Sequence, residues 1–171
     1  GLPENDPLKV SSLSYNGGSE LYLAMKPYKM MGEILRQQPR DIVFSVCQYG
    51  MSDVWKWGDA VNGNCWRTTN DITDTWASVK NIALDQDKSA PYAKPGNWND
   101  PDMLVVGHVG WGNPHPSKLK PDEQYLHISL WSLFAAPLLI GCDMEKLDDF
   151  TLNLLTNDEV IEVNQDPLGK Q

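Results

Sequence analysis

Two short stretches of the chain carry the residues whose types and spacing could do chemistry. The first is CWRTTND, from Cys65 to Asp71, and the second is WNDPDML, from Trp98 to Leu104. In each, carboxylates stand beside tryptophan at what we predict to be the end of a strand. Carboxylates and an arginine can hydrogen-bond hydroxyl groups, and an indole face can pack on a pyranose ring. A buried carboxylate is costly unless it is paired or used, so this gathering indicates a polar pocket suited to a sugar.

The hydrophobic pattern predicts strands and helices that mostly alternate. Apolar runs typical of strands buried on both faces stand at 42–46, 103–106 and 138–140. Residues 66–72 are predicted to form a second, shorter strand. Helical patterns begin near Pro27 and end before Pro39, cover 74–84 and 122–136, and fill 145–163 in two pieces broken near Asn157. Residues 1–20 are interpreted as a loop or ragged N-terminal segment, 107–121 as a long loop, and 164–171 as the start of a linker.

This order predicts an α/β fold with a parallel sheet. The notable polar residues all end or follow a strand, and in such folds active sites lie at that face; they are Gln48, Arg67, Asp71, Asp102 and Asp143. Four strands are half of an eight-stranded barrel, whose usual length is about 250 residues. We therefore expect residues 21–163 to be the second half of a (β/α)8 TIM barrel, about strands five to eight, in a fragment of a larger protein.

Composition excludes several classes of partner. The chain has 171 residues and a formal net charge of −9, and this acidic balance argues against nucleic acid. No apolar run approaches the roughly 20 residues of a membrane span. The sequence has no Cys-x-x-Cys unit and its three histidines are not spaced as ligand pairs, so neither a metal nor another cofactor is expected.

Cys47, Cys65 and Cys142 are the three cysteines. Cys47 and Cys65 both stand where a predicted strand meets its following loop, which favours a disulfide between them. Two buried free thiols are the alternative. A cysteine pair and a sugar substrate together favour a secreted, periplasmic or lysosomal protein.

The two stretches, with FSVCQYG at 44–50 and NQDPLG at 164–169, resemble the α-galactosidase and α-N-acetylgalactosaminidase family, glycoside hydrolase family 27 of clan D. The resemblance covers nearly the whole chain from Lys26 onward. It implies a retaining hydrolase on a (β/α)8 barrel that removes terminal α-linked galactose-type sugars. The implied partner is an α-galactoside or a related oligosaccharide or glycoconjugate, and a homo-oligomer is compatible with it.

The resemblance also implies roles for individual residues. The family uses a nucleophilic aspartate in a Lys-x-Asp motif and a second aspartate as general acid/base, which Asp71 matches. The Lys-x-Asp motif is absent here, so we expect it upstream and expect this segment alone to be inactive. Arg67 matches a residue that contacts the sugar, and Asp102 and Met103 match pocket residues. Gln48 stands where galactose-preferring relatives often carry a glutamate that faces the 2-position. Met51 and Ser52 fall where relatives differ in selecting a 2-hydroxyl or a 2-acetamido group, so galactose, N-acetylgalactosamine and arabinopyranose all stay open.

Retaining glycosidases need two carboxyl groups about 5–5.5 Å apart, one that attacks and one that protonates the leaving oxygen. The acid keeps its proton where its surroundings disfavour the charged form. For Asp71, we expect Trp66 and the nearby nucleophile to supply those surroundings.

The resemblance also extends to two cysteines. Cys47 and Cys65 match a pair that forms a loop disulfide in part of the family.

Each role has a structural alternative. Asp71 could cap the helix near Asp74, although Asp74 is the more natural cap. Arg67 could be a structural ion-pair partner, and Asp100 before Pro101 is expected to set a turn. Asp143 is expected to cap the next helix. For the whole chain, the competing function is a non-catalytic carbohydrate-binding barrel that has lost its nucleophile.

Overall fold

The structure, a computed structural model, describes residues 18–110 and 112–170. Its centre is a three-stranded parallel sheet in the order β1 (Ser45–Val46), β2 (Cys65–Arg67), β3 (Trp98–Asp100). Beyond β3, a single parallel bridge links Leu104 to Ile140, in the predicted fourth strand. The predicted α/β class and parallel order are therefore confirmed.

The strands are shorter than the sequence predicted. At 42–46 only Ser45 and Val46 form a strand, and Val43 is 78% exposed. At 138–140 only Ile140 forms a bridge, and it is 48% exposed. Neither segment has a second neighbouring strand among the described residues, because β1 is an edge of the three-stranded sheet and Ile140 pairs only with Leu104 in an isolated bridge. A strand at an edge leaves backbone groups unpaired on one side, and Val43 and Ile140 are exposed because no described segment packs over their side chains.

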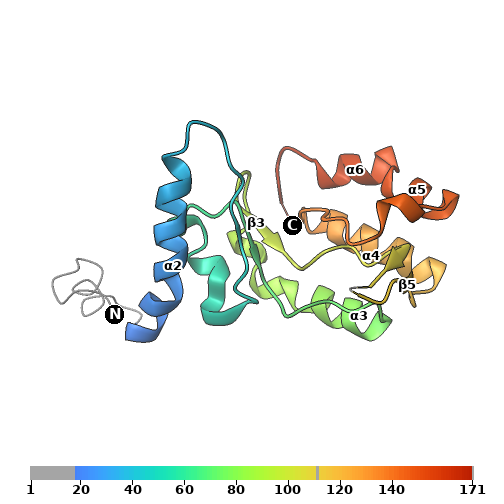
Figure 1. Cartoon of the computed structure of the whole chain (residues 1–171), viewed down its shortest axis with the longest axis horizontal. Coiled ribbons are helices and arrows are strands. Elements are labelled where there is room, and N and C mark those ends of the chain that lie inside the picture. The colour runs from blue at the N-terminus through green and yellow to red at the C-terminus, as the bar shows by residue number, and fades with distance from the viewer. Residues whose placement is uncertain (1–17, 111, 171) are drawn as a thin grey trace.

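The described residues form five α-helices, with α2 at one end of the molecule and α5 and α6 at the other (Figure 1). Their bounds are α2 (Gly18–Arg36), α3 (Trp76–Leu84), α4 (Pro121–Leu133), α5 (Asp149–Leu155) and α6 (Asp158–Asn164). The predicted break near Asn157 is confirmed, because the Asn157 side chain accepts a hydrogen bond from the Val160 backbone at 3.1 Å and so caps α6. None of these helices is long and apolar enough to cross a membrane.

The first helix begins well before Pro27, which lies inside α2. The predicted loop at 1–20 is thus wrong for its last three residues, and residues 1–17 lie outside the described part. The signal for the earlier start is the spacing of Tyr22, Met25 and Tyr28, one face of a helix. Tyr22 and Met25 are 8% and 7% exposed, so packing holds the first turns despite the proline.

Short elements fill the connections. The 3-10 turns are η1 (Met51–Lys56), η2 (Asp59–Val61), η3 (Gln86–Lys88), η4 (Ala90–Tyr92) and η5 (Met144–Lys146). The predicted long loop contains a small antiparallel hairpin of β4 (His108–Val109) and β5 (His115–Pro116). Asp143 caps η5 by accepting from the Glu145 backbone at 3.1 Å, as expected.

Two hydrophobic clusters hold these elements together. One lies under α3, α4 and α5 and includes Val79, Leu104 and Trp131. The other joins β1, β2 and η1 and includes Trp55, Trp57 and Trp66. The tryptophans of the second cluster are buried in the core, where they cannot stack on a bound sugar.

Candidate active site

The parallel register brings the polar residues after β2 and β3 together. Arg67 ends β2 and pairs with Asp100, which ends β3. Asp71 follows four residues after Arg67, and Asp102 two residues after Asp100. The ends of neighbouring parallel strands meet at one edge of the sheet, so all these side chains start from the same place.

Arg67 links the two aspartates. Its Nη2 lies 2.9 Å from Asp71 Oδ1 and 2.8 Å from Asp102 Oδ2. The side chains of Arg67 and Asp102 are only 11% and 8% exposed, whereas that of Asp71 is 77% exposed. The Arg67 guanidinium also lies over the Tyr49 ring, 5.2 Å from its centroid. The pattern is a buried ion pair with a second, outward-facing carboxylate attached to it.

Asp102 is held in an unusual backbone conformation, with φ +93°. Its backbone N–H donates to Asp100 Oδ1 at 2.8 Å, and its carbonyl accepts from Trp131 Nε1 at 2.6 Å. Its carboxylate accepts backbone N–H groups from Ile72 and Met103, each at 2.7 Å. Because Ile72 follows Asp71 directly, Asp102 fixes both the arginine and the backbone that carries Asp71. These bonds leave the Asp102 carboxylate with little capacity for sugar hydroxyls.

Asp100 sets the turn between β3 and Asp102, as expected from its place before Pro101. Its side chain accepts from the Asp102 backbone and it is 2% exposed. Burial raises the pKa of Asp100, against the lowering effect of that hydrogen bond and of Arg67.

Neither Asp71 nor Asp74 caps α3. Thr75 does so, because its side chain accepts from the Ser78 backbone at 3.3 Å. Asp74 instead accepts from the Lys118 backbone and from His115 Nε2, each at 3.0 Å, and so ties this segment to the β4–β5 hairpin. Burial alone would raise the pKa of Asp74, but these bonds and the Lys118 charge lower it.

Trp66 does not provide apolar surroundings for Asp71, so that expectation is wrong. Successive side chains of a strand point to opposite faces, and Trp66 points into the core opposite Arg67. It is 1% exposed and donates from Nε1 to Asn99 Oδ1 at 2.8 Å.

Neither the Gln48 nor the Met103 side chain makes a hydrogen bond to this cluster among the described residues, although the Met103 backbone N–H donates to Asp102. Gln48 is half-buried after β1, and its backbone carbonyl accepts from Met51 at 2.9 Å. The half-buried Met103 packs against the hydrophobic cluster under α4. Sequence reasoning missed Tyr49, which lies under Arg67, because nothing in its spacing indicates that contact.

The predicted disulfide is wrong: Cys47, Cys65 and Cys142 are free thiols. The register explains why, because Cys65 pairs with Ser45 and Cys47 lies two residues further on. With about 4.8 Å between strands and about 3.3 Å per residue, the two Cα atoms lie about 8 Å apart. A disulfide spans less than about 7 Å.

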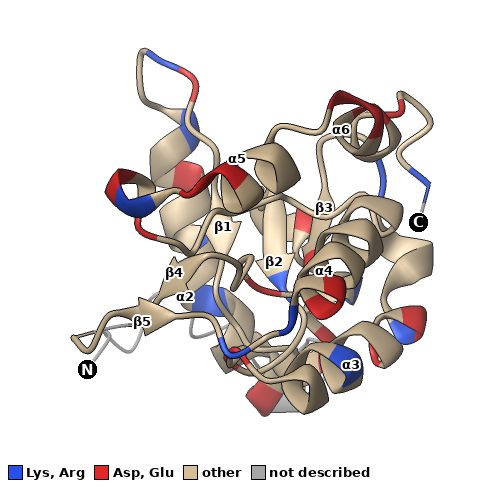
Figure 2. Ribbon diagram, turned by 90° about the vertical axis from the view of Figure 1, so that its right-hand side faces the viewer, with Lys and Arg blue, Asp and Glu red and all other residues tan. Residues whose placement is uncertain are grey.

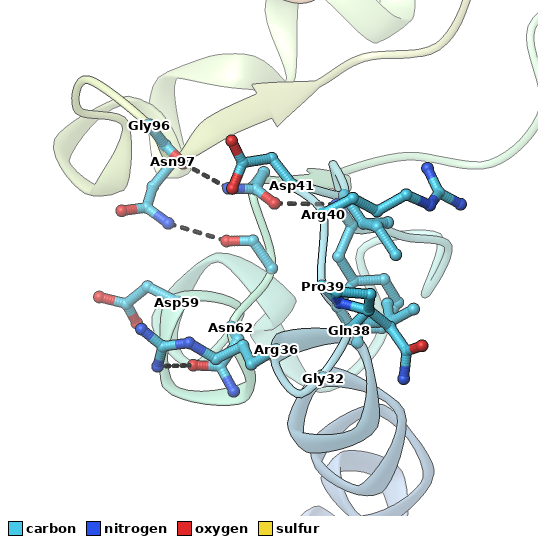
Figure 3. A pocket seen from close by; sticks show the side chains of 15 residues that line it. Gly32, Arg36, Gln38, Pro39, Arg40, Asp41, Asp59, Asn62, Gly96 and Asn97 are labelled. Atoms are coloured by element: carbon cyan, nitrogen blue, oxygen red, sulfur yellow. Dashed lines mark hydrogen bonds between the residues drawn. The ribbon is translucent and has the colours of Figure 1, made fainter.

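A cavity of about 800 Å³ lies at the opposite, N-terminal ends of the strands (Figure 3). Its asparagines are used by the fold. Asn64 Oδ1 accepts from the Phe44 backbone and Asn97 Nδ2 donates to the Gly63 carbonyl, each at 2.8 Å. A second space, of about 540 Å³, is lined by Asp71 itself.

The described residues hold no group of three His, Cys, Asp or Glu side chains that could bind a metal ion. On the face shown in Figure 2, basic positions are interspersed with acidic ones. At the strand ends, Arg67, Asp71 and Asp102 bring a guanidinium and carboxylates together, which are groups that can hydrogen-bond a neutral polar ligand.

Known proteins resemble this chain over most of its length. A family model described as alpha galactosidase A matches residues 6–166. Alpha-galactosidase 2 of Arabidopsis thaliana is 47% identical over 144 residues, which are 84% of this chain and 34% of that protein. A crystal structure of a candidate α-galactosidase/melibiase from Bacteroides fragilis has a TM-score of 0.83 and 40% identity, covering 88% of this chain and 34% of that one.

A GH27 β-L-arabinopyranosidase from Geobacillus stearothermophilus has a TM-score of 0.77 and 30% identity, covering 86% of this chain and 34% of that chain. The chain thus spans about a third of the length of these proteins. Sequence and backbone agree over most of its residues, and the chain belongs to the α-galactosidase family, glycoside hydrolase family 27.

Proposed function

We propose that this chain carries the acid/base part of the active site of a retaining α-galactosidase. The observation that carries the proposal is the link from Arg67 to both Asp71 and Asp102. The order β1, β2, β3 and then the Leu104–Ile140 bridge supports strands five to eight of a (β/α)8 barrel. The nucleophile would stand on the preceding strand, upstream of this chain.

In the first step, the nucleophile attacks the anomeric carbon while Asp71 donates its proton to the departing glycosidic oxygen. The bond between the anomeric carbon and that oxygen breaks, and a galactosyl-enzyme ester forms. In the second step, the ionised Asp71 takes a proton from water as the water attacks the same carbon, the ester bond to the nucleophile breaks, and galactose and the free nucleophile carboxylate are released. Arg67 orients Asp71 through Oδ1, which leaves Oδ2 for the proton transfer.

Asp102 acts as a positioning residue in this scheme. It holds Arg67 through Oδ2 and the backbone of Ile72 through the same atom. Gln48 and Met103 are proposed to face the sugar. The choice among galactose, N-acetylgalactosamine and arabinopyranose falls to the residues after β1, including Gln48.

The test is Asp71→Asn in the full-length protein, with Asp87→Asn, an exposed aspartate of η3, as the matched control. We expect Asp71→Asn to lower kcat/KM on 4-nitrophenyl α-galactoside at least about 100-fold, the usual scale of general acid–base catalysis. Azide needs no general base, so it should restore turnover of a dinitrophenyl galactoside and yield α-galactosyl azide.

Unchanged activity in Asp71→Asn would refute the acid/base role. A loss that azide does not rescue would make Asp71 structural. Galactose binding without hydrolysis by the wild-type protein would favour the carbohydrate-binding alternative.

A further inference from the structure

The carboxylate of Asp74 joins the β4–β5 hairpin to the segment that follows Asp71. It is 8% exposed, and its Oδ2 accepts from the Lys118 backbone N–H and lies 3.0 Å from His115 Nε2. Its Oδ1 lies 3.4 Å from Lys118 Nζ. These contacts connect parts of the chain that are 41 and 44 residues apart. We call Asp74, His115 and Lys118 the hairpin joint.

The His115 ring is held at both of its nitrogens. Nε2 faces Asp74 Oδ2 at 3.0 Å, and Nδ1 faces the Asn113 carbonyl oxygen at 2.9 Å. A carbonyl oxygen only accepts hydrogen bonds, and so does an ionised carboxylate. The two hydrogen bonds therefore need an N–H on both ring nitrogens, which only the charged imidazolium has.

Asp74 is ionised in this arrangement. Burial acts to raise its pKa, but the Lys118 backbone N–H, the His115 bond and the Lys118 charge outweigh burial and lower that pKa. A carboxylate without a proton cannot donate to His115 Nε2. The proton of this contact thus lies on the ring.

The backbone of the hairpin leaves room for the ring. Gly110 has φ +110°, a conformation that residues with a Cβ rarely adopt. A Cβ at this position would lie 2.9 Å from His115 Nδ1 and 2.5 Å from the Asn113 carbonyl oxygen. Glycine at 110 therefore allows the chain to close around the bond between His115 and Asn113.

The surroundings of His115 favour its charged form. Among the described residues, the charged groups that act on it are Asp74, from the segment before α3, and Lys118, just after β5. The Asn113 carbonyl and Asp74 raise the pKa of His115 above the usual 6.5, against burial and the Lys118 charge, which act to lower it.

We propose that the hairpin joint is a pH-sensitive latch, in which protonated His115 ties the β4–β5 hairpin to Asp74 and neutral His115 loses one of its two bonds. A neutral ring has one N–H, so its other nitrogen would face an oxygen with a lone pair. The His115 side chain is 32% exposed, so water can replace the lost bond. Lys118 keeps its own bonds to Asp74, and the latch therefore loosens without releasing the hairpin.

The latch is closed in acid. The pKa of His115 is higher in the folded protein than in the unfolded chain, so its contribution to stability is complete below about pH 6.5 and is lost as the pH rises through the raised pKa. An open latch leaves the segment from Asp71 to Asp74 with one anchor fewer. This inference concerns the fold and does not depend on the proposed function.

The first measurement is the titration of His115 itself in the full-length protein. Deuterium exchange at the ring Cε1–H, followed by mass spectrometry as a function of pH, gives the pKa of each histidine separately. We expect the midpoint for His115 to lie above 6.5 and Asp74→Asn to lower it. Asp87→Asn, at an exposed aspartate of η3, is the control and should leave the midpoint unchanged.

The second measurement follows the hairpin. The Lys118 amide donates to Asp74, so its protection against hydrogen exchange, corrected for the intrinsic rate, reports on the latch. Between about pH 5.5 and pH 8.5 we expect the wild type to lose about fivefold in protection, the scale of one hydrogen bond. His115→Gln does not titrate and should show no such loss. His108→Gln, the same change at a hairpin histidine that lies opposite Pro116, is the matched control and should respond as the wild type does.

Two results would overturn the latch. One is a His115 midpoint at or below 6.5, or a midpoint that Asp74→Asn does not lower. The other is an equal loss of Lys118 amide protection in the wild type and in His115→Gln. The wild-type titration needs no substitution, so it decides the question even if Asp74→Asn does not fold.

Discussion

Acid should destabilise this protein through one buried histidine, His127. Its side chain is fully buried, and Nε2 accepts a hydrogen bond from the Val105 backbone at 3.1 Å. The ring meets Trp131 edge to face, 4.2 Å between centroids. Burial lowers the pKa of His127 to about 3. The histidine is therefore neutral in the folded protein at every pH at which the protein would be handled.

The magnitude follows from linkage. The folded pKa lies below the unfolded value, so the unfolded chain binds more protons as the pH falls below about 6.5. Each pH unit in that range costs about 1.4 kcal/mol of stability. From pH 7.5 to pH 4.5 the integrated loss from His127 is about 2.5 kcal/mol, and the loss continues toward pH 3.

The assay is urea denaturation of the full-length protein at pH 7.5 and pH 4.5, for wild type and His127→Gln. Glutamine keeps an acceptor for the Val105 N–H but does not titrate. The other ionisable groups titrate alike in both proteins, so they cancel in the comparison. We expect wild type to lose about 2.5 kcal/mol more than the variant between the two pH values. An equal loss in the two proteins would refute the reasoning.

Three further perturbations test the site. Arg67→Ala should lower the free energy of unfolding by about 3 kcal/mol, because it leaves the buried Asp102 carboxylate without its cation, and Asp102→Asn should recover part of that loss; an unchanged melting temperature would contradict this. Gly50→Ala should lower the melting temperature, because φ is +77° and the added Cβ would lie 2.1 Å from a backbone carbonyl; a variant as stable as wild type would contradict it. Iodoacetamide should modify exposed Cys47 in the native protein and Cys65 only after unfolding, because burial raises the pKa of the Cys65 thiol; peptide mapping that finds equal labelling would show the opposite.

Helices were easier to predict than strands because their signals are local. Pro121 opens α4, and Asn157 separates α5 from α6 through its own side chain. A strand depends on partners far away in the sequence, so the apolar run that contains Val43 predicts a strand only where a neighbour exists to pair with it. The start of α2 was predicted too late for a different reason. Proline favours the first turn of a helix, but the buried side chains of Tyr22 and Met25 extend α2 to residues before Pro27.

The disulfide was wrongly predicted because the sequence does not show how two strands are aligned with each other. Cys47 directly follows β1, as the sequence indicated, but Cys65 begins β2 instead of ending a strand. Whether they can bond depends on an offset of two residues between β1 and β2. A one-residue or two-residue shift in pairing changes no local pattern, so only the assembled sheet reveals it.

The candidate site, like the fold, could be predicted from the sequence only in part. The sequence was enough to predict that Arg67, Asp71 and Asp102 share one edge of the sheet, because each follows a strand. It left open whether Asp71 caps a helix, and the structure assigns that task to Thr75. With its carboxylate not needed by α3, Asp71 is tied only to Arg67, on a segment whose next backbone N–H is held by Asp102. One buried carboxylate thus fixes both the guanidinium and the chain that carries the exposed carboxylate. The orientation of Asp71 is therefore set from behind through Oδ1, while its side chain stays 77% exposed.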